Sequence, residues 1–140
     1  MTTYLLDTDI AIELLRGRNL AVAAQLASRD RNTIFLSTVT VGELTFGALR
    51  SQEQTRSTVI CRQFCSAFQL VELDREAGER SGVIRADLEG RGERIGAYDV
   101  LIAGIALAGG HVLATHNVRE FGRVAGLRID DWAAIPYGSA

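Results

Sequence analysis

The stretch Tyr4-Leu5-Leu6-Asp7 places an acidic residue directly after a short apolar run. Three later stretches share this pattern: Val39-Thr40-Val41-Gly42 leads to Glu43, Gly96-Ala97-Tyr98 leads to Asp99, and Val112-Leu113-Ala114-Thr115 ends shortly before Asn117 and Glu120. A buried carboxylate is costly unless it is paired or binds a metal. Several carboxylates at the edge of one core therefore predict a divalent-cation site with oxygen ligands.

Strands alternate with helices along the chain. Apolar runs bounded by turn residues predict strands at 3–6, 33–36, 70–73 and 111–115, and a last edge strand at 127–129. Helical periodicity predicts helices at 9–16, 20–27, 40–49, 53–68, 75–89, 97–108 and 118–121. This order predicts an α/β fold, with a central parallel sheet of four to five strands flanked by helices on both faces. The length of 140 residues fits a single domain, 1–140.

The predicted topology brings the acidic residues together. In parallel sheets the functional cleft lies at the carboxyl ends of the strands. Asp7 ends the first strand, and residues 115–120 follow the fourth. Glu43 and Asp99 lie near the starts of helices on adjacent crossovers. All of these residues are therefore expected at one edge of the sheet.

Each acid also has a purely structural explanation. Asp7 suits a helix N-cap, and Glu43 forms a capping-box pattern with Thr40. Asp99 suits the positive end of a helix dipole, and Glu120 on a short turn suits a solvated surface charge. Each signal is weak alone, but their order and local contexts together favour the metal site.

The basic residues narrow the chemistry. All 15 are Arg, and the chain contains no Lys. This excludes Schiff-base enzymes and P-loop proteins, which need a Lys, whereas guanidinium groups suit phosphate contacts. The formal net charge is −2, and a metal that neutralised four acids would leave the remainder at +2. RNA affinity would therefore depend on a local Arg patch.

The remaining titratable residues give little support to other reactions. Cys61 and Cys65 lie four residues apart on a predicted helix and are expected to be small buried apolar groups. Neither His111 nor His116 has a metal-binding partner at ligand spacing, and His111 is expected at the surface. With no Lys and no well-placed His as general base, activation of water is left to a metal.

No apolar run reaches the roughly 18–20 residues of a membrane span. The N-terminus has Asp7 and Asp9 where a signal peptide would be apolar. A cytoplasmic protein without membrane association is expected.

The motifs together resemble a known family. Leu5-Leu6-Asp7-Thr8-Asp9-Ile10 resembles the opening of PIN-domain nucleases, and in particular of VapC toxins from type II toxin–antitoxin systems. The resemblance continues through three further blocks: 37–44 with Gly47; 84–89, the Gly-rich turn and 98–103; and 113–121 with Val124, 126–127 and 131–132. It covers about Leu5 to Trp132, nearly the whole chain.

The resemblance implies an endoribonuclease that depends on Mg²⁺, with Mn²⁺ as a substitute. It implies metal ligands at Asp7, Glu43 and Asp99, and catalytic acids at these three positions and at Glu120. Many PIN nucleases carry Asp where this chain has Asn117, which is why Glu120 becomes the fourth acid. Residues expected to support the site are Thr8, Asp9, Thr115 and Asn117.

The expected partners are RNA, an antitoxin and a second copy of the chain. Arg85, Arg91 and Arg94 flank the third block and are expected to bind RNA phosphates, while Tyr98 is the only aromatic residue expected near the site. The resemblance further implies a VapB-like antitoxin that blocks the site, and a homodimer. The candidate dimer surface consists of Leu44, Phe46 and the 53–68 helix.

In-line attack by activated water would leave a 5′-phosphate and a 3′-hydroxyl. Two other functions remain open. One is a metal-binding or RNA-binding module of the same fold that does not cleave, to which Asn117 points. The other is a phosphatase with Asp7 as nucleophile and Asp9 as acid, against which the missing Lys argues.

Overall fold

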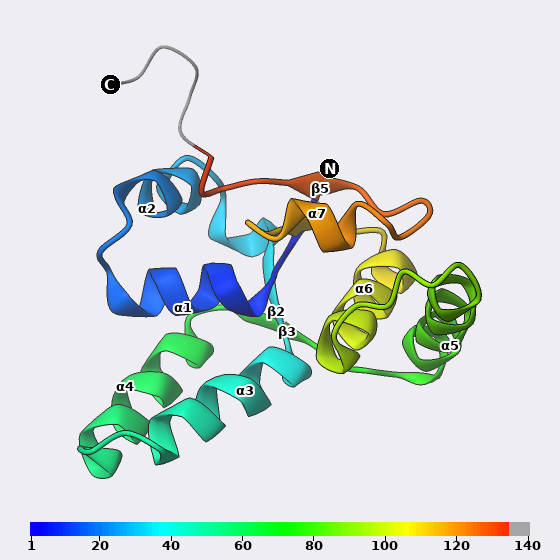
Figure 1. Ribbon diagram of the computed structural model, residues 1–140. Helices are drawn as coiled ribbons and strands as arrows, with labels where there is room; N and C mark the ends of the chain where they lie inside the picture. The colour runs from blue at the N-terminus through cyan, green and yellow to red at the C-terminus, as the bar shows by residue number, and fades with distance from the viewer. Residues whose placement is uncertain (135–140) are drawn as a thin grey trace.

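The computed structural model describes residues 1–134, so the end of the single domain predicted over 1–140 lies outside the described residues. Within them, strands and helices alternate (Figure 1). The strands are β1 (Tyr4–Leu6), β2 (Ile34–Ser37), β3 (Gln69–Val71), β4 (Val112–Ala114) and β5 (Ile129–Asp130). The helices are α1 (Thr8–Arg16), α2 (Leu20–Ala27), α3 (Thr38–Leu49), α4 (Gln54–Ser66), α5 (Arg75–Gly90), α6 (Ala97–Gly109) and α7 (Val118–Phe121), and a 3₁₀ turn at Arg31–Thr33 precedes β2.

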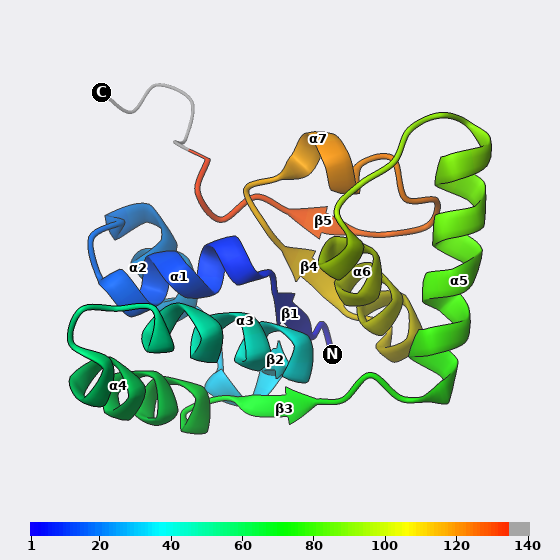
Figure 2. The same cartoon turned by 60° about the horizontal axis from the view of Figure 1, so that its bottom comes forward.

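The sheet is parallel, as predicted, and its strand order is β3-β2-β1-β4-β5. β1 lies in the centre, where Leu5 pairs with Phe35 of β2 and with Leu113 of β4. The chain builds outward through β2 and β3, then crosses back to β4 on the other side of β1 (Figure 2). The ligand crevice of such a sheet lies beyond the strand ends at this reversal. Asp7, the first residue after β1, stands at that point.

Helices cover both faces of the sheet. Successive side chains of a strand face opposite sides, so Leu5 and Leu6 belong to different cores. Leu6 packs with buried residues of α1–α4, whereas Leu5 packs with those of α5, α6 and α7. Figure 2 shows α1–α4 gathered on one side of the molecule and α5 and α6 on the other.

The segment after β5 is fastened to the first core. Trp132 is fully buried, and its ring centroid lies 5.8 Å from that of Tyr4. The guanidinium carbon of Arg29 lies 4.6 Å from the Tyr4 ring centroid and 4.8 Å from that of Trp132. Arg29 also forms an ion pair of 3.1 Å with Asp130. These cation–π contacts and the ion pair tie Arg29, which follows α2, to the segment after β5.

Two residues predicted at the surface are buried instead. Leu44 is only 4% exposed and packs in the core under α3, so it cannot contribute to a dimer surface, whereas Phe46 is 63% exposed. His111 is 7% exposed, because its ring packs 4.8 Å from that of Phe35 and its Nδ1 lies 2.6 Å from the hydroxyl of Thr3. The prediction that Cys61 and Cys65 are buried is confirmed, and both are free thiols.

The start of α3 differs from the predicted capping box. The N-cap is Ser37, whose Oγ accepts a hydrogen bond from the Thr40 N–H at 3.1 Å. Thr40 therefore lies inside α3, and Glu43 lies beyond the first turn, where its carboxylate is available for another contact. Within residues 1–134, none of the helices is long and apolar enough to cross a membrane.

Candidate active site

Asp7 is the most buried acid of the site, at 3% exposure. It is the N-cap of α1: its Oδ1 accepts from the Thr8 N–H at 2.8 Å, and its Oδ2 accepts from the Thr115 hydroxyl at 2.8 Å. Its own N–H donates to the Ala114 carbonyl at 2.9 Å. Burial, followed by the charges of Asp9 and Asp99, raises the pKa of Asp7 to about 8, against a smaller opposing effect of the Thr115 hydroxyl.

Glu43 is linked to Thr8, the residue after Asp7, by a chain of hydroxyl groups. The Thr8 hydroxyl donates to Glu43 Oε1 at 2.8 Å and lies 2.9 Å from the Thr40 hydroxyl. The single hydroxyl proton of Thr8 is used on Glu43, so Thr40 is the donor to Thr8. The Ser37 hydroxyl in turn donates to Thr40 at 3.2 Å. Such a relay polarises each bond in the same direction and points α3 at the end of β1.

Asp99 enters the same cluster from the first turn of α6. Burial, then the charges of Glu120, Glu43 and Asp9, raises the pKa of Asp99 to about 6. A Cβ placed on Gly96, the N-cap of α6, would stand 3.0 Å from Asp99 Oδ2, so this position leaves room for the carboxylate. The structure therefore brings the acids that the sequence placed on different elements within electrostatic reach of one another.

At the fourth position an amide and an acid are hydrogen-bonded to each other. The Asn117 side-chain amide donates to Glu120 Oε2 at 3.1 Å, and the Asn117 N–H donates to the Thr115 hydroxyl at 2.9 Å. Glu120 contributes to the pKa of Asp99, whereas Asn117 orients Glu120. Asn117 thus lies beside Glu120, and its supporting role in the site stays a prediction.

Sequence reasoning missed one residue beside the acids. The His116 N–H donates to Asp9 Oδ2 at 3.1 Å, and its ring Nδ1 lies 3.1 Å and 3.3 Å from the two carboxylate oxygens of Asp131. His116 was not among the residues predicted for the site. The position of His116 directly after Thr115, at the end of a strand, could have indicated that it lies near the acids. Its contact with Asp131 could not be predicted, because it depends on where β5 docks.

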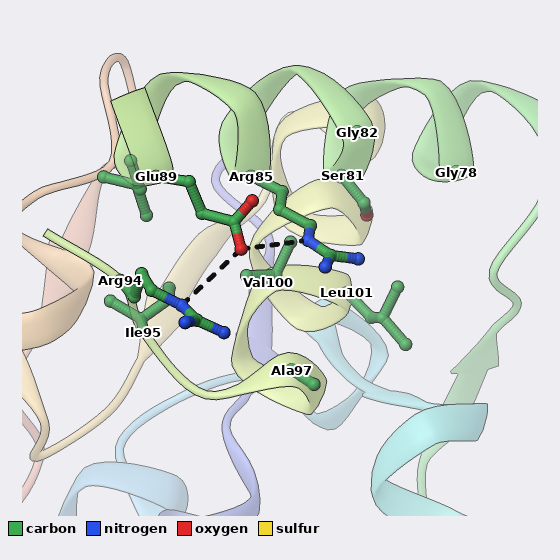
Figure 3. Close-up of a pocket in the computed structure, with 11 residues that line it drawn as sticks. Gly78, Ser81, Gly82, Arg85, Glu89, Arg94, Ile95, Ala97, Val100 and Leu101 are labelled. Atoms are coloured by element: carbon green, nitrogen blue, oxygen red, sulfur yellow. Dashed lines mark hydrogen bonds and ion pairs between the residues drawn. The ribbon is translucent and has the colours of Figure 1, made fainter. Parts of the chain in front are cut away.

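The three predicted RNA-binding arginines lie along the end of α5 and the turn after it. Arg85 Nε and Arg94 Nε lie 3.4 Å and 3.5 Å from the same oxygen of Glu89, and Figure 3 shows both guanidinium groups converging on it. Arg91 instead pairs with Asp87 and Glu93, each at 2.9 Å.

Arg85 and Arg94 also line a groove of about 390 Å³ between α5 and α6. Its other lining residues are small or apolar: Gly78, Ser81, Gly82, Leu88, Ile95, Ala97, Val100 and Leu101, together with Glu89 (Figure 3). The groove lies beside the N-terminal half of α6, which carries Asp99.

Within residues 1–134, there is no group of three or more Asp, Glu, His or Cys side chains that could hold a metal ion as they stand. The chemistry of the donor set nevertheless fits a hard divalent cation, which prefers carboxylate oxygens. Among the described residues, neither Asp7 nor Asp99 forms an ion pair, and the carboxylates around them raise their pKa. A cation would relieve that repulsion.

Comparison with known proteins agrees with this arrangement. The family described as PIN domain matches residues 4–127. The tRNA(fMet)-specific endonuclease VapC of Shigella flexneri is 35% identical over 133 residues, which are 95% of this chain and 100% of that protein. Ribonuclease VapC2 of Haemophilus influenzae is 32% identical over 132 residues, 94% of this chain and 99% of that protein.

Solved structures give the same result. A chain in the crystal structure of DNA-bound VapBC from Salmonella typhimurium matches with a TM-score of 0.88 at 32% identity, covering 94% of this chain and 99% of that chain. VapBC-1 from nontypeable Haemophilus influenzae matches with a TM-score of 0.86 at 30% identity, covering 95% and 100%. The fold, the acidic cluster and these relatives agree: the chain belongs to the PIN-domain family and, within it, to the VapC ribonucleases, the toxins of type II toxin–antitoxin systems.

Proposed function

We propose that this VapC endoribonuclease hydrolyses RNA with the help of Mg²⁺, or Mn²⁺ in its place, held by Asp7, Glu43 and Asp99. The observation that carries the proposal is the buried carboxylate of Asp7, which lies in one cluster with Asp9 and Asp99. Burial and these neighbouring charges raise its pKa. Such an arrangement is unfavourable in isolation and becomes favourable when a divalent ion is bound.

The residues of the chain divide the remaining work. A bound Mg²⁺ would supply an activated water and charge relief on the phosphate. Thr115 and Thr8 fix the carboxylates of Asp7 and Glu43 by hydrogen bonds of 2.8 Å. Asn117 fixes Glu120, the fourth catalytic acid of the proposal. Because ligand orientation depends on such outer contacts, these three polar side chains matter nearly as much as the acids.

The proposed substrate and partner are those named for related proteins. Because a relative at 35% identity is a tRNA(fMet)-specific endonuclease, initiator tRNA is the first substrate to test. The phosphates of the tRNA would be bound by Arg85, Arg91 and Arg94. These guanidinium groups now form ion pairs with carboxylates of the protein and would exchange them for phosphates. Solved relatives are VapBC complexes, which supports a VapB-like antitoxin as partner.

A homodimer is the other proposed assembly. Its surface would be built from Phe46 of α3 and from the partly exposed Val59 and Ile60 of α4, without the buried Leu44. Replacing Phe46 with Arg should convert a dimer into a monomer in sedimentation analysis without changing the fold. A dimer that persists in Phe46→Arg would place the interface elsewhere.

The activity test uses labelled initiator tRNA with Mg²⁺, with EDTA, and with two matched variants. Asp99→Asn should lower cleavage by about 100-fold. Glu79→Gln, which neutralises an exposed carboxylate on α5, should leave cleavage nearly unchanged. Products should carry a 5′-phosphate and a 3′-hydroxyl. Cleavage that survives EDTA, or that is undiminished in Asp99→Asn, would refute the metal-dependent reaction.

The binding-only alternative was based on Asn117 in place of an acid. In the structure the Asn117 amide donates to the Glu120 carboxylate. An acid is therefore present beside Asn117, even though position 117 itself is an amide. Tight binding of tRNA without cleavage in either Mg²⁺ or Mn²⁺ would favour the binding module. Release of phosphate from small phosphoesters would favour the phosphatase reading.

A further inference from the structure

The turn that follows β4 is tied to the acidic cluster by three consecutive residues. The Thr115 hydroxyl donates to Asp7 and accepts from the Asn117 N–H. Between them, the His116 N–H donates to Asp9 Oδ2. The backbone at His116 is therefore fixed relative to the buried carboxylates, whatever its side chain does.

The imidazole on this turn is itself oriented. Both carboxylate oxygens of Asp131 lie within 3.3 Å of His116 Nδ1, so Nδ1 carries the proton of that contact. Among the described residues, no hydrogen bond involves Nε2. The side chain is 65% exposed, and the ring therefore presents Nε2 to solvent at the rim of the site.

Three carboxylates face this ring: Asp131 from the segment after β5, and Asp9 and Glu13 from α1. The hydrogen bond and charge of Asp131 come first in raising the pKa of His116, with smaller contributions from Asp9 and Glu13. The imidazolium form is thus favoured beside a cluster that is otherwise acidic, and its Nε2–H is a donor without acceptor character.

We propose that His116 is a positioning residue for RNA, whose Nε2–H donates to a backbone phosphate next to the bond that is cut, while Asp131 holds the ring through Nδ1. The proposal rests on the proposed nuclease function and deepens it. A phosphate oxygen is the anionic acceptor that an RNA backbone offers to such a donor. Asp131 acts one step removed, because it orients His116 and does not itself reach the RNA.

The test measures RNA binding without turnover. Fluorescein-labelled initiator tRNA is titrated with Ca²⁺ in place of Mg²⁺, and gels confirm that it stays intact. At pH 6, His116→Gln should weaken binding about fivefold, as expected for one exposed charge-assisted contact. The slope of log affinity against log salt should fall by about 0.7, which is the contribution of one phosphate contact to a single strand. At pH 9, parent and variant should bind alike, because His116 is then neutral.

Two further variants separate this role from a structural one. Arg56→Gln removes one exposed positive charge from the first turns of α4 and should leave the binding of the tRNA unchanged. In the parent, affinity for the tRNA should fall as the pH rises and His116 loses its charge. Asp131→Asn should move that fall to lower pH, because Asp131 raises the pKa of His116. The chain has only two histidines, so their ring signals can be assigned by NMR in His116→Gln, and the His116 signal should titrate above and the His111 signal below the ordinary value.

An unchanged salt slope in His116→Gln at pH 6, or equal weakening at pH 6 and pH 9, overturns the positioning role. If the parent still cleaves tRNA with Mg²⁺ in that case, only this inference fails. If the parent neither binds nor cleaves tRNA, the proposed function fails with it.

Discussion

Asp7 should make the metal-free protein less stable as the pH rises, and Asp7→Asn should remove that loss. Because the folded pKa is raised from 3.8 to about 8, the folded state keeps a proton that the unfolded chain has already released. Stability from this group is therefore complete at low pH and declines between about pH 4 and 8. Four pKa units correspond to on the order of 5 kcal/mol over the whole window.

In the window from pH 6.5 to 8 the change is dominated by Asp7, because the pKa of Asp99 is about 6 and that group has largely titrated below this window. The titration of His116, whose pKa is raised above 6.5, is common to the parent and Asp7→Asn and cancels in the difference between them. Urea unfolding in EDTA should show the free energy of unfolding of the parent falling by about 1 kcal/mol per pH unit there, because folded Asp7 is almost fully protonated at pH 6.5 and half protonated at pH 8. Asp7→Asn should show a much flatter dependence and should be more stable than the parent at pH 8. The control Glu79→Gln, which neutralises an exposed carboxylate on α5, should follow the parent. Parallel curves for parent and Asp7→Asn would refute the burial argument.

Other perturbations test the surroundings of the site. Thr8→Val removes the donor to Glu43 and should lower kcat by about 10-fold to 100-fold, whereas Thr45→Val, which removes an exposed hydroxyl on α3, should not change kcat. Gly104→Ala would push a methyl group into the α5 backbone and should lower the unfolding free energy by about 1–3 kcal/mol. Gly82→Ala, whose methyl group would meet open space, should be tolerated. Urea unfolding compares the two variants, and equal stability would contradict the close packing of α5 on α6. Because cation binding requires deprotonated carboxylates, Mg²⁺ should raise the Tm more at pH 8 than at pH 6, and calorimetry that finds the reverse would exclude the buried acids as ligands.

The convergence of the acids could be predicted because it follows from chain order. In a parallel sheet every strand ends at the same edge, so residues directly after β1 and β4 must lie near each other. Asp7 and Thr115 are such a pair, and their hydrogen bond is local to two neighbouring strand ends. The alternation of apolar strands and amphipathic helices likewise determined the layers.

Contacts made by side chains across the chain could not be predicted in the same way. α3 is apolar on most of its surface, so its sequence does not show that Leu44 faces the core while Phe46 faces solvent. The cap of α3 is Ser37, three residues before the Thr40 that was considered for capping. The His116–Asp131 contact joins residues whose proximity is set by the docking of a two-residue strand. Such a short strand carries too few side chains to specify its register from sequence.

Trp132 gives the molecule a built-in optical probe. It is the only tryptophan of the chain, its indole is shielded from water between Tyr4 and Arg29, and it directly follows the residue that orients His116. Detachment of this segment would expose the indole and shift its fluorescence emission to longer wavelength. Ligand binding that tightens or loosens the rim can therefore be followed in the unlabelled protein, by selective excitation of a single chromophore.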